Sequence, residues 1–284
     1  MRILVTGGTG QVGRAVVERA RDAGHEVTAA PHRGPGGCDV ADAPAVDAIV
    51  DAIRPDLVVH AAALTDVDGC EHDPARAHRV NVEGTAHLAA AATRVGAHVV
   101  LLSTDYVYGG DLGRPYVEDD AVRPLSVYGA TKLAAEGRLG PGATVVRTSW
   151  VSSPTGGVVP TVLRLARGQD GPLRFVDDQW GSPTVADDLA IPLLALGLDR
   201  RGGVWHVAGR GAATWCDVAR RTLAAAGLDP DRVEGVATAS RPPRPARRPR
   251  ATVLDTSALE AAGLALDPWE EAVDRLVGRI TAAG

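Results

Sequence analysis

The chain has 284 residues, of which 45% are hydrophobic and 23% charged, and its formal net charge is -5 at pH 7. This is an ordinary globular composition, long enough for one domain with a lobe or for two domains. The negative charge argues against a general nucleic-acid binder, and no stretch approaches the roughly 18 uncharged apolar residues of a membrane span. The first strand pattern begins at once, which leaves no room for a cleavable signal.

Strand and helix patterns alternate through the first 150 residues. Short apolar, β-branched runs predict strands at residues 3–6, 26–30, 57–61, 98–103 and 144–149. Helical spacing of apolar residues predicts helices at residues 11–23, 42–53, 75–95 and 126–139. This alternation indicates an α/β fold with a doubly wound parallel sheet of the Rossmann type. Its continuously apolar strands are those of a sheet covered on both faces.

The alternation loosens after residue 150. Pro154, Gly156, Gly157 and Pro160 indicate a loop. Further on, helices are expected at residues 184–198 and 214–226 and a strand at residues 204–207. Five arginines and four prolines in residues 241–250 exclude regular structure. We therefore predict a dinucleotide-binding domain over residues 1–150, to which later segments can return, and a smaller, mainly substrate-binding lobe over residues 151–284.

A glycine-rich turn links the first strand to the first helix. Gly7, Gly10 and Gly13 are spaced as in a dinucleotide-binding turn, with Gln11 and Val12 opening the helix. The glycines permit a tight turn and a close approach of the backbone to a pyrophosphate. The helix N-terminus then offers free amides to the phosphates. The turn predicts dinucleotide binding.

The end of the second strand bears on the choice of cofactor. The acidic residue that usually holds the adenine ribose there is missing, since the strand ends at Ala30 and Arg33 follows. Arg33 is suited to a 2′-phosphate, which favours NADPH; the alternative is that it faces solvent. Asp39 and Val40 lie in a loop that can reach the adenine.

Lys132 is the only lysine among the 30 basic residues. It follows Tyr128 by four residues, so that on a helix the two side chains share a face. A free tyrosine has a pKa of about 10, and a nearby cation favours its phenolate. The spacing predicts a proton-transfer pair. An ordinary surface lysine beside a packed tyrosine is the alternative. Three widely spaced cysteines, Cys38, Cys70 and Cys216, show no metal or disulfide spacing, which indicates a reducing cytoplasm.

Several longer sequence motifs are distributed along the whole chain. They occupy residues 61–68, 80–85, 103–108, 124–132, 147–150, 178–184, 206–209, 247–249 and 254–256. With these motifs the chain resembles the extended short-chain dehydrogenases, and more closely the dTDP-4-dehydrorhamnose reductases. The resemblance implies that Thr104 bonds the sugar carbonyl, that Tyr128 supplies the proton, and that Lys132 holds the nicotinamide ribose and tunes Tyr128.

The resemblance also implies the rest of the site. Residues expected at the cofactor are Gly7, Gly10, Gln11, Val12, Gly13, Arg33, Asp39, Val40, Ala61, Ala62, Ala63, Thr65, Ser103, Tyr128 and Lys132. Thr104, Asp105, Tyr106 and Trp150 are expected at the sugar. A loop carboxylate and a packed indole are the alternatives for Asp105 and Trp150. Asn81, the only asparagine, is suited either to a structural bond to backbone or to a water relay.

Some positions depart from the family pattern. Ser152 replaces an aromatic residue after Val151, which predicts a wider sugar pocket. Arg14 and Ala15 stand where some members carry an acid for magnesium, so no metal site is expected. In the arginine-proline segment, Arg247 or Arg248 is suited to the nucleotide diphosphate, and a solvated loop is the alternative.

The resemblance thus implies a cytoplasmic reductase of a dTDP-linked 4-keto-6-deoxy sugar that uses NADPH and accepts NADH. The default substrate is dTDP-4-dehydro-L-rhamnose. A related sugar of a specialised pathway is one alternative, and a non-catalytic regulatory subunit on the same fold is another. A homodimer is compatible with the sequence; no nucleic-acid or membrane partner is expected.

The cofactor expectation is tested by Arg33→Ala. A charge-assisted contact with a 2′-phosphate is worth a modest free energy, so kcat/KM for NADPH should fall by roughly tenfold, at about 1.4 kcal/mol per factor of ten. The value for NADH should stay nearly unchanged. Steady-state kinetics with both cofactors decide the matter, and equal losses for the two would mean that Arg33 supports its loop and does not contact the phosphate.

Overall fold

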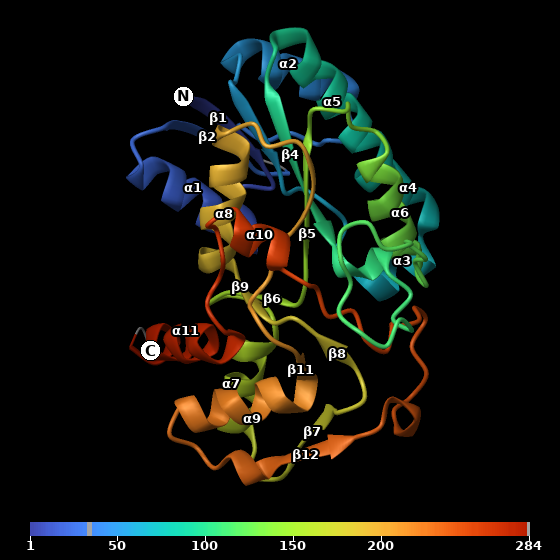
Figure 1. Cartoon of the computed structure of the whole chain (residues 1–284), viewed down its shortest axis with the longest axis vertical. Helices are drawn as coiled ribbons and strands as arrows, with labels where there is room; N and C mark the ends of the chain where they lie inside the picture. Colours follow the sequence, from blue (N-terminus) through green and yellow to red (C-terminus); the bar gives the residue numbers. More distant parts are fainter. Residues whose placement is uncertain (33–35, 283–284) are drawn as a thin grey trace.

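The computed structural model describes residues 1–32 and 36–282. Its central element is a six-stranded sheet in the order β10-β5-β4-β3-β1-β2, with every neighbouring pair parallel (Figure 1). The strands are β1 (Arg2–Thr6), β2 (Glu26–Ala30), β3 (Leu57–His60), β4 (His98–Thr104), β5 (Thr144–Thr148) and β10 (Gly203–His206). The chain turns back beside β1, so the switch point of the sheet adjoins the glycine turn.

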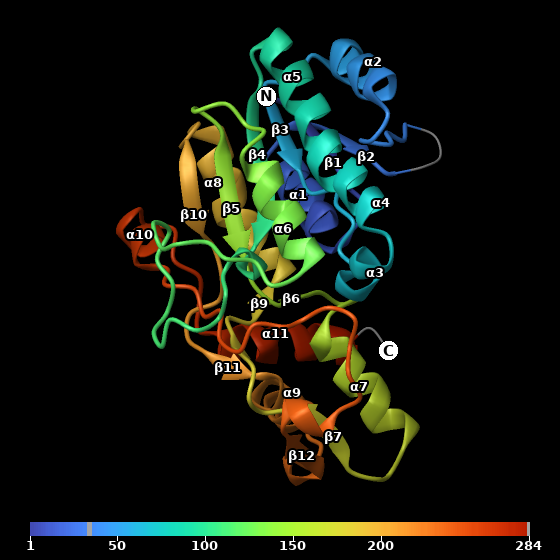
Figure 2. The same cartoon turned by 90° about the vertical axis from the view of Figure 1, so that its right-hand side faces the viewer.

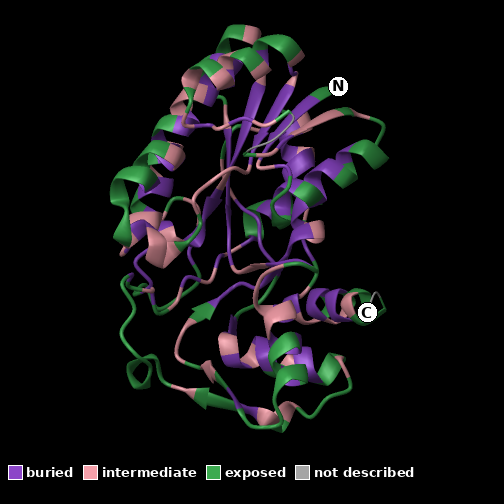
Figure 3. Ribbon diagram, turned by 180° about the vertical axis from the view of Figure 1, so that it is seen from behind, coloured by how far each residue is buried: buried purple, intermediate pink, exposed green. Residues whose placement is uncertain are grey.

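Helices cover both faces of this sheet. On one face lie α1 (Gln11–Asp22) and α8 (Ala186–Leu198), and on the other lie α2 (Ala43–Ile53) and α5 (Gly84–Val95) (Figure 1). Successive strand residues point to opposite faces. Accordingly Ile3 and Val5 pack into the core beneath α1 and α8, and Leu4 packs beneath α2 and α5. Figure 3 shows the resulting buried sheet between exposed helix surfaces.

Shorter helices border the second face near the carboxyl ends of the strands. They are α3 (Val67–His72), α4 (Pro74–His78) and α6 (Val127–Glu136). Helix α6 begins at Ser126, whose Oγ accepts from the amide of Gly129 at 3.2 Å. A Cβ on Gly129 would lie 2.2 Å from the carbonyl oxygen of Tyr106. The missing side chain therefore lets α6 approach the end of β4 closely.

A smaller lobe lies below the carboxyl edge of the sheet (Figure 2). Its helices are α7 (Val158–Gly168), α9 (Trp215–Ala225) and α11 (Trp269–Ala282), with α10 (Ser257–Ala261) beside the sheet. Its strand pairs are β6 (Val151–Ser152) with β9 (Thr184–Val185), β7 (Leu173–Val176) with β12 (Val233–Val236), and β8 (Trp180–Gly181) with β11 (Ala213–Thr214). The buried sides of α7, α9 and α11 form two apolar clusters of its own. The assignment of residues 151–284 mainly to the lobe stays a prediction, since α8 and β10 lie with the sheet.

The predicted α/β fold with a parallel, doubly wound sheet is confirmed. Strand β2 has the predicted bounds, and the other early elements differ by a few residues at their ends. One helix predicted as continuous, over residues 75–95, was wrong in detail: a π-helical turn, Arg79–Glu83, separates α4 from α5. Such turns are local distortions that often accompany functional sites.

The π-helical turn carries Asn81 and brings it to the end of β3. The Asn81 side chain accepts from the amide of Leu64 at 2.7 Å and donates to the Leu64 carbonyl at 3.2 Å and to the Thr131 hydroxyl at 3.0 Å. Of the two roles considered for this residue, the structural bond to backbone is therefore present.

The lobe contains the larger errors of the sequence analysis. The loop expected around Pro160 is partly wrong, since Pro160 lies in the first turn of α7. Proline is tolerated there because amides of the first turn have no partner within the helix. As predicted, the segment 241–250 forms no helix or strand; a short 3-10 turn, Thr238–Ser240, precedes it. Among the described residues, no helix is long and apolar enough to cross a membrane.

Candidate active site

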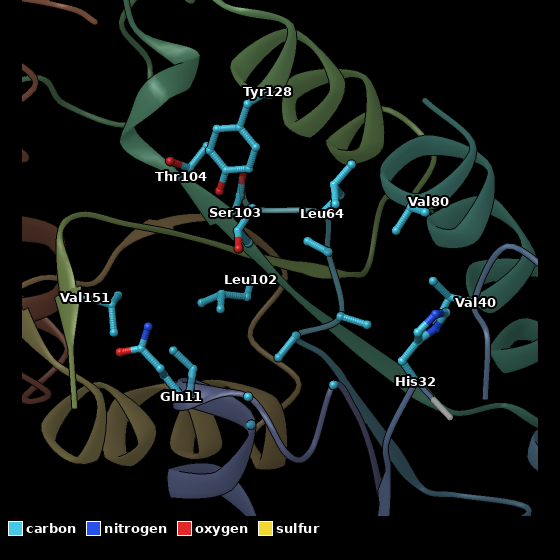
Figure 4. A pocket seen from close by; sticks show the side chains of 18 of the residues that line it. Gln11, His32, Val40, Leu64, Val80, Leu102, Ser103, Thr104, Tyr128 and Val151 are labelled. Carbon is cyan, nitrogen blue, oxygen red and sulfur yellow. The ribbon is translucent and has the colours of Figure 1, made fainter. Parts of the chain in front are cut away.

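A cavity of about 810 Å³ follows the carboxyl ends of β1, β3, β4 and β5 and extends to the lobe (Figure 4). Most of the residues predicted at the site line it. They are Gly7, Gly10, Gln11, Val12, Gly13, Asp39, Val40, Ala61, Ala62, Ala63, Thr65, Ser103, Thr104, Asp105, Tyr106, Tyr128 and Trp150. Arg33 lies outside the described residues. The structure thus brings the ends of four strands to one elongated cavity, a shape suited to a dinucleotide and a second ligand in line.

The glycine turn has the geometry of a phosphate-binding cradle. Gly7 has a φ of +68°, and a Cβ there would lie 2.7 Å from the amide nitrogen of Ala62. A Cβ on Gly13 would lie 2.1 Å from the carbonyl oxygen of Gly7. Helix α1 begins after Gly10 with no side-chain cap. Its first amides are therefore available to an anionic ligand, and the backbone can approach that ligand closely.

The far end of the cavity lies between His32, Val40 and Val80 (Figure 4). The carboxylate of Asp39 accepts from the amide of Ala41 at 3.0 Å and lies 3.8 Å from His32 Nδ1. This end of the cavity thus combines the apolar side chains of Val40 and Val80 with the polar pair His32 and Asp39.

Thr104 and Tyr128 lie side by side at the opposite end (Figure 4). Thr104 is the last residue of β4, and its Oγ1 accepts from the amide of Tyr106 at 3.2 Å. The rings of Tyr106 and Tyr128 meet edge to face, with their centroids 6.0 Å apart. Burial raises the pKa of Tyr128 well above its ordinary value, and the Thr104 hydroxyl opposes this rise only in part.

Lys132 is buried, with 2% of its surface exposed, and is not among the residues that line the cavity. Burial lowers the pKa of Lys132 to about 8, against the raising effect of Glu136. The alternative of a surface lysine is therefore wrong. Loss of hydration dominates the titration of the Tyr128 phenol in this structure, so its pKa is raised; that Lys132 tunes the phenol stays a prediction.

Asp105 is buried and fully engaged. Its carboxylate accepts from the hydroxyls of Thr252 at 2.5 Å, Ser149 at 3.0 Å and Thr104 at 3.1 Å. Burial raises the pKa of Asp105 to about 6, and these three donors oppose the rise. The carboxylate therefore ties the end of β4 to that of β5 and orients the Thr104 hydroxyl at the cavity wall.

Trp150 forms the wall toward the lobe. Its φ is 45°, an uncommon conformation for a bulky residue, and its indole stacks on Trp215 with centroids 3.6 Å apart and planes 9° apart. A Cβ on Gly181 would lie 2.4 Å from this indole. Ser152, in contrast, is buried and accepts from the amide of Val158 at 3.2 Å. Ser152 does not line the cavity in this structure, and the wider sugar pocket stays a prediction.

The arginine-proline segment is anchored to α3. Arg248 pairs with Asp68 through both carboxylate oxygens, at 2.7 and 3.0 Å, and the Ala246 amide donates to the same carboxylate at 3.1 Å. Arg247 is exposed. Neither arginine lines the cavity, and a contact of Arg247 or Arg248 with the nucleotide diphosphate stays a prediction.

Sequence reasoning missed some residues that line the cavity. They are Thr9, His32, Cys38, Ala41, Leu64, Val67, Arg76, Arg79, Val80, Leu102, Thr148, Val151 and Trp215. Most of them flank strand ends that had been identified, so extending each motif by one or two residues would have found them. Trp215 has no such signal, because it comes from the start of α9 in the lobe. No cluster of metal-binding side chains occurs within residues 1–32 and 36–282; that the protein binds no metal stays a prediction.

The fold and the cavity define a dinucleotide-binding enzyme of the extended short-chain dehydrogenase type. The family model described as "RmlD substrate binding domain" matches residues 1–282, and the chain belongs to this family. It is 41% identical to a dTDP-4-dehydrorhamnose reductase of Mycolicibacterium smegmatis, over 99% of this chain and 86% of the relative.

Solved structures agree with this assignment. A dTDP-4-dehydrorhamnose reductase from Clostridium acetobutylicum superposes with a TM-score of 0.93 at 34% identity, covering 99% of this chain and all of that one. One from Bacillus anthracis, in complex with NADP, gives a TM-score of 0.91 at 31% identity over 97% and 98% of the two chains.

The placement of Tyr128 beside Thr104 generates a test. Tyr128→Phe keeps the ring and removes the hydroxyl, so kcat should fall by about 10²–10⁴, the usual contribution of a general acid. The dissociation constant of NADPH should stay near that of the parent. Tyr116→Phe is a matched control, because the Tyr116 hydroxyl accepts from the amides of Gly110 and Asp111 away from the cavity. Equal activity of the two variants would remove Tyr128 from the reaction centre.

Proposed function

We infer that this enzyme reduces the C4 keto group of a dTDP-4-keto-6-deoxyhexose with NADPH, and converts dTDP-4-dehydro-L-rhamnose into dTDP-L-rhamnose. The observation that carries the inference is the pairing of Thr104 and Tyr128 at one end of a cavity whose other end is a dinucleotide cradle. Membership of the family along nearly the whole chain supports the choice of substrate.

The residues of the glycine turn fit the cofactor. The close contacts that a Cβ would make at Gly7 and Gly13 mark a backbone packed tightly around the turn, and the uncapped α1 offers its amides to the pyrophosphate. The nicotinamide supplies the hydride when it is bound. The adenine is assigned to the apolar end of the cavity, between Val40 and Val80.

We assign the remaining chemistry to three side chains. The Thr104 hydroxyl donates to Asp105 in this structure, and we assign its hydrogen bond to the carbonyl oxygen of the sugar once substrate is bound. The Tyr128 hydroxyl gives that oxygen its proton. The raised pKa of Tyr128 keeps the phenol protonated near neutral pH, which is the state that a proton donor requires. Lys132 would hold the nicotinamide ribose and stabilise the phenolate of Tyr128 as it forms.

The sugar subsite is assigned to the lobe side of the cavity. Trp150 lines this part of the cavity, and Tyr106 lies beside Tyr128. Asp105 acts mainly through Thr104, since its carboxylate oxygens already accept three hydroxyl bonds. We place the enzyme in the cytoplasm, because its three cysteines are free and buried. A homodimer stays a prediction, to be measured by sedimentation.

The experiment is to mix the purified chain with NADPH and dTDP-4-dehydro-L-rhamnose and to follow the loss of NADPH absorbance. The expected product, identified by NMR, is dTDP-L-rhamnose. Lys132→Arg should lower kcat strongly, because a planar guanidinium has the wrong size and donor geometry for the ribose and phenol. Binding of NADPH without turnover of any dTDP-4-keto sugar would contradict the proposed function and favour the non-catalytic alternative.

A further inference from the structure

A buried ion pair lies directly behind the reaction centre. Glu136 of α6 and Arg147 of β5 are joined at 2.7 Å between Oε2 and Nη2 and at 3.1 Å between Oε1 and Nε. Their side chains are only 8% and 6% exposed. The Ser103 hydroxyl donates to Glu136 Oε1 at 2.5 Å. One carboxylate thus receives donors from two neighbouring strands.

The place of this carboxylate in the chain relates it to the catalytic candidates. Glu136 follows Lys132 by four residues, so the two lie on one side of α6. Ser103 directly precedes Thr104 and pairs in register with Arg147. Glu136 therefore connects α6, which carries Tyr128, to the end of β4, which carries Thr104.

Arg147 is held from its other side as well. Its Nη1 donates to the Tyr108 hydroxyl at 2.7 Å, and that hydroxyl lies 2.7 Å from Nε2 of the buried His206. The arginine also donates to the Glu118 carbonyl at 3.2 Å. Every part of the guanidinium is therefore fixed, and the orientation of Glu136 is determined by the sheet.

Stability alone is a weak reason for this arrangement. The loss of hydration of two buried charges can exceed their attraction, and apolar replacements of such pairs are often tolerated. A role in geometry and local charge explains why the pair lies here, against the helix that bears the only lysine of the chain.

We propose that Glu136 is a positioning residue: its carboxylate, held by Arg147, fixes the catalytic helix against the sheet and stabilises the charged form of Lys132. The inference rests on the proposed function, because it takes Lys132 to act in that reaction centre. Glu136 itself does not line the cavity and is assigned no contact with substrate or cofactor.

Other titratable groups lie near Lys132 or its helix. Tyr128 precedes Lys132 by four residues on α6, and the charge of Lys132 acts on His60 of β3. The charges of Asp105, Tyr106 and Cys70 act on Tyr128, and Glu71 accepts from the amide of Val127 at 2.8 Å. Burial, aided by the charge of Lys132, lowers the pKa of His60 to about 3, so this histidine is neutral wherever the enzyme works. Burial raises the pKa of Tyr106 to about 12. Glu136 is the one carboxylate that raises the pKa of Lys132.

The test compares the pH profiles of kcat/KM for two single variants. Glu136→Gln removes the charge that favours protonated Lys132, so the loss of activity on the alkaline side should begin about one pH unit lower than in the parent. Arg147→Met leaves Glu136 unneutralised beside Lys132, so its alkaline limb should stay or move higher. Both variants should lose kcat, since both release the helix.

The pH dependence of the NADPH dissociation constant gives a second readout that needs no turnover. It should shift in the same directions, because Lys132 is assigned to the ribose. Asp274→Asn is the matched control, because it removes the charge of a carboxylate that forms an ion pair with Arg221 in the lobe, away from α6. This control should keep the alkaline limb of the parent's kcat/KM profile and the parent's pH dependence of the NADPH dissociation constant.

The double variant Glu136→Gln with Arg147→Met keeps the test decisive if a single variant does not fold, because it leaves neither charge unpaired. It should fold, have a lower kcat than the parent, and begin its alkaline loss of kcat/KM at a lower pH than the parent. A folded double variant with the parent's kcat and limb would contradict the proposal, and so would alkaline limbs that move together in the two single variants.

Failure of all the variants to fold would make the pair a folding element only, and would also contradict the proposed role. A failure of the proposed function is recognised separately, because the parent itself would then not reduce the dTDP-sugar.

Discussion

Parallel strands covered by helices on both faces must end at a common edge, and this constraint determines where chemistry can occur in the chain. Thr104 ends a strand of this sheet, and Gly7, Ala61 and Trp150 come just after other strands of the same sheet. They meet although they are far apart in sequence. The lobe then closes the edge from below, with Trp215 stacked on Trp150. The resulting cavity has a dinucleotide end and a polar, hydroxyl-rich end.

The sheet was predictable because each strand is a short apolar run and because residues that end helices mark the end of the connecting helices. Strand β2 ends as expected, and Gly96 closes α5 in the left-handed conformation. The π-helical turn at Arg79–Glu83 was not predictable, because it arises from side-chain bonds of Asn81 to a distant backbone. The start of helix α7 was not predictable, because the prolines and glycines around it indicate a loop, although Pro160 occupies the first turn of the helix.

The site was predictable where residue type and strand end coincide, as at Thr104 and Asp105. The burial of the site side chains and their hydrogen-bond partners were not predictable, since both depend on packing between segments distant in sequence. Tyr128 has a pKa shifted opposite to the expectation for a phenol beside a lysine, because loss of hydration dominates. Arg248 forms an ion pair with Asp68 on α3, and no spacing in the sequence signals that pair.

The central claim is that the cavity brings the hydride of NADPH to C4 of a dTDP-linked sugar beside Thr104 and Tyr128. The most direct measurement uses NADPH that carries deuterium on both positions of nicotinamide C4, in ordinary water. The account predicts a dTDP-6-deoxyhexose with one deuterium, bound to C4 of the sugar, as seen by NMR and mass spectrometry. A reduced sugar without deuterium at C4, or with deuterium at another carbon, would contradict it.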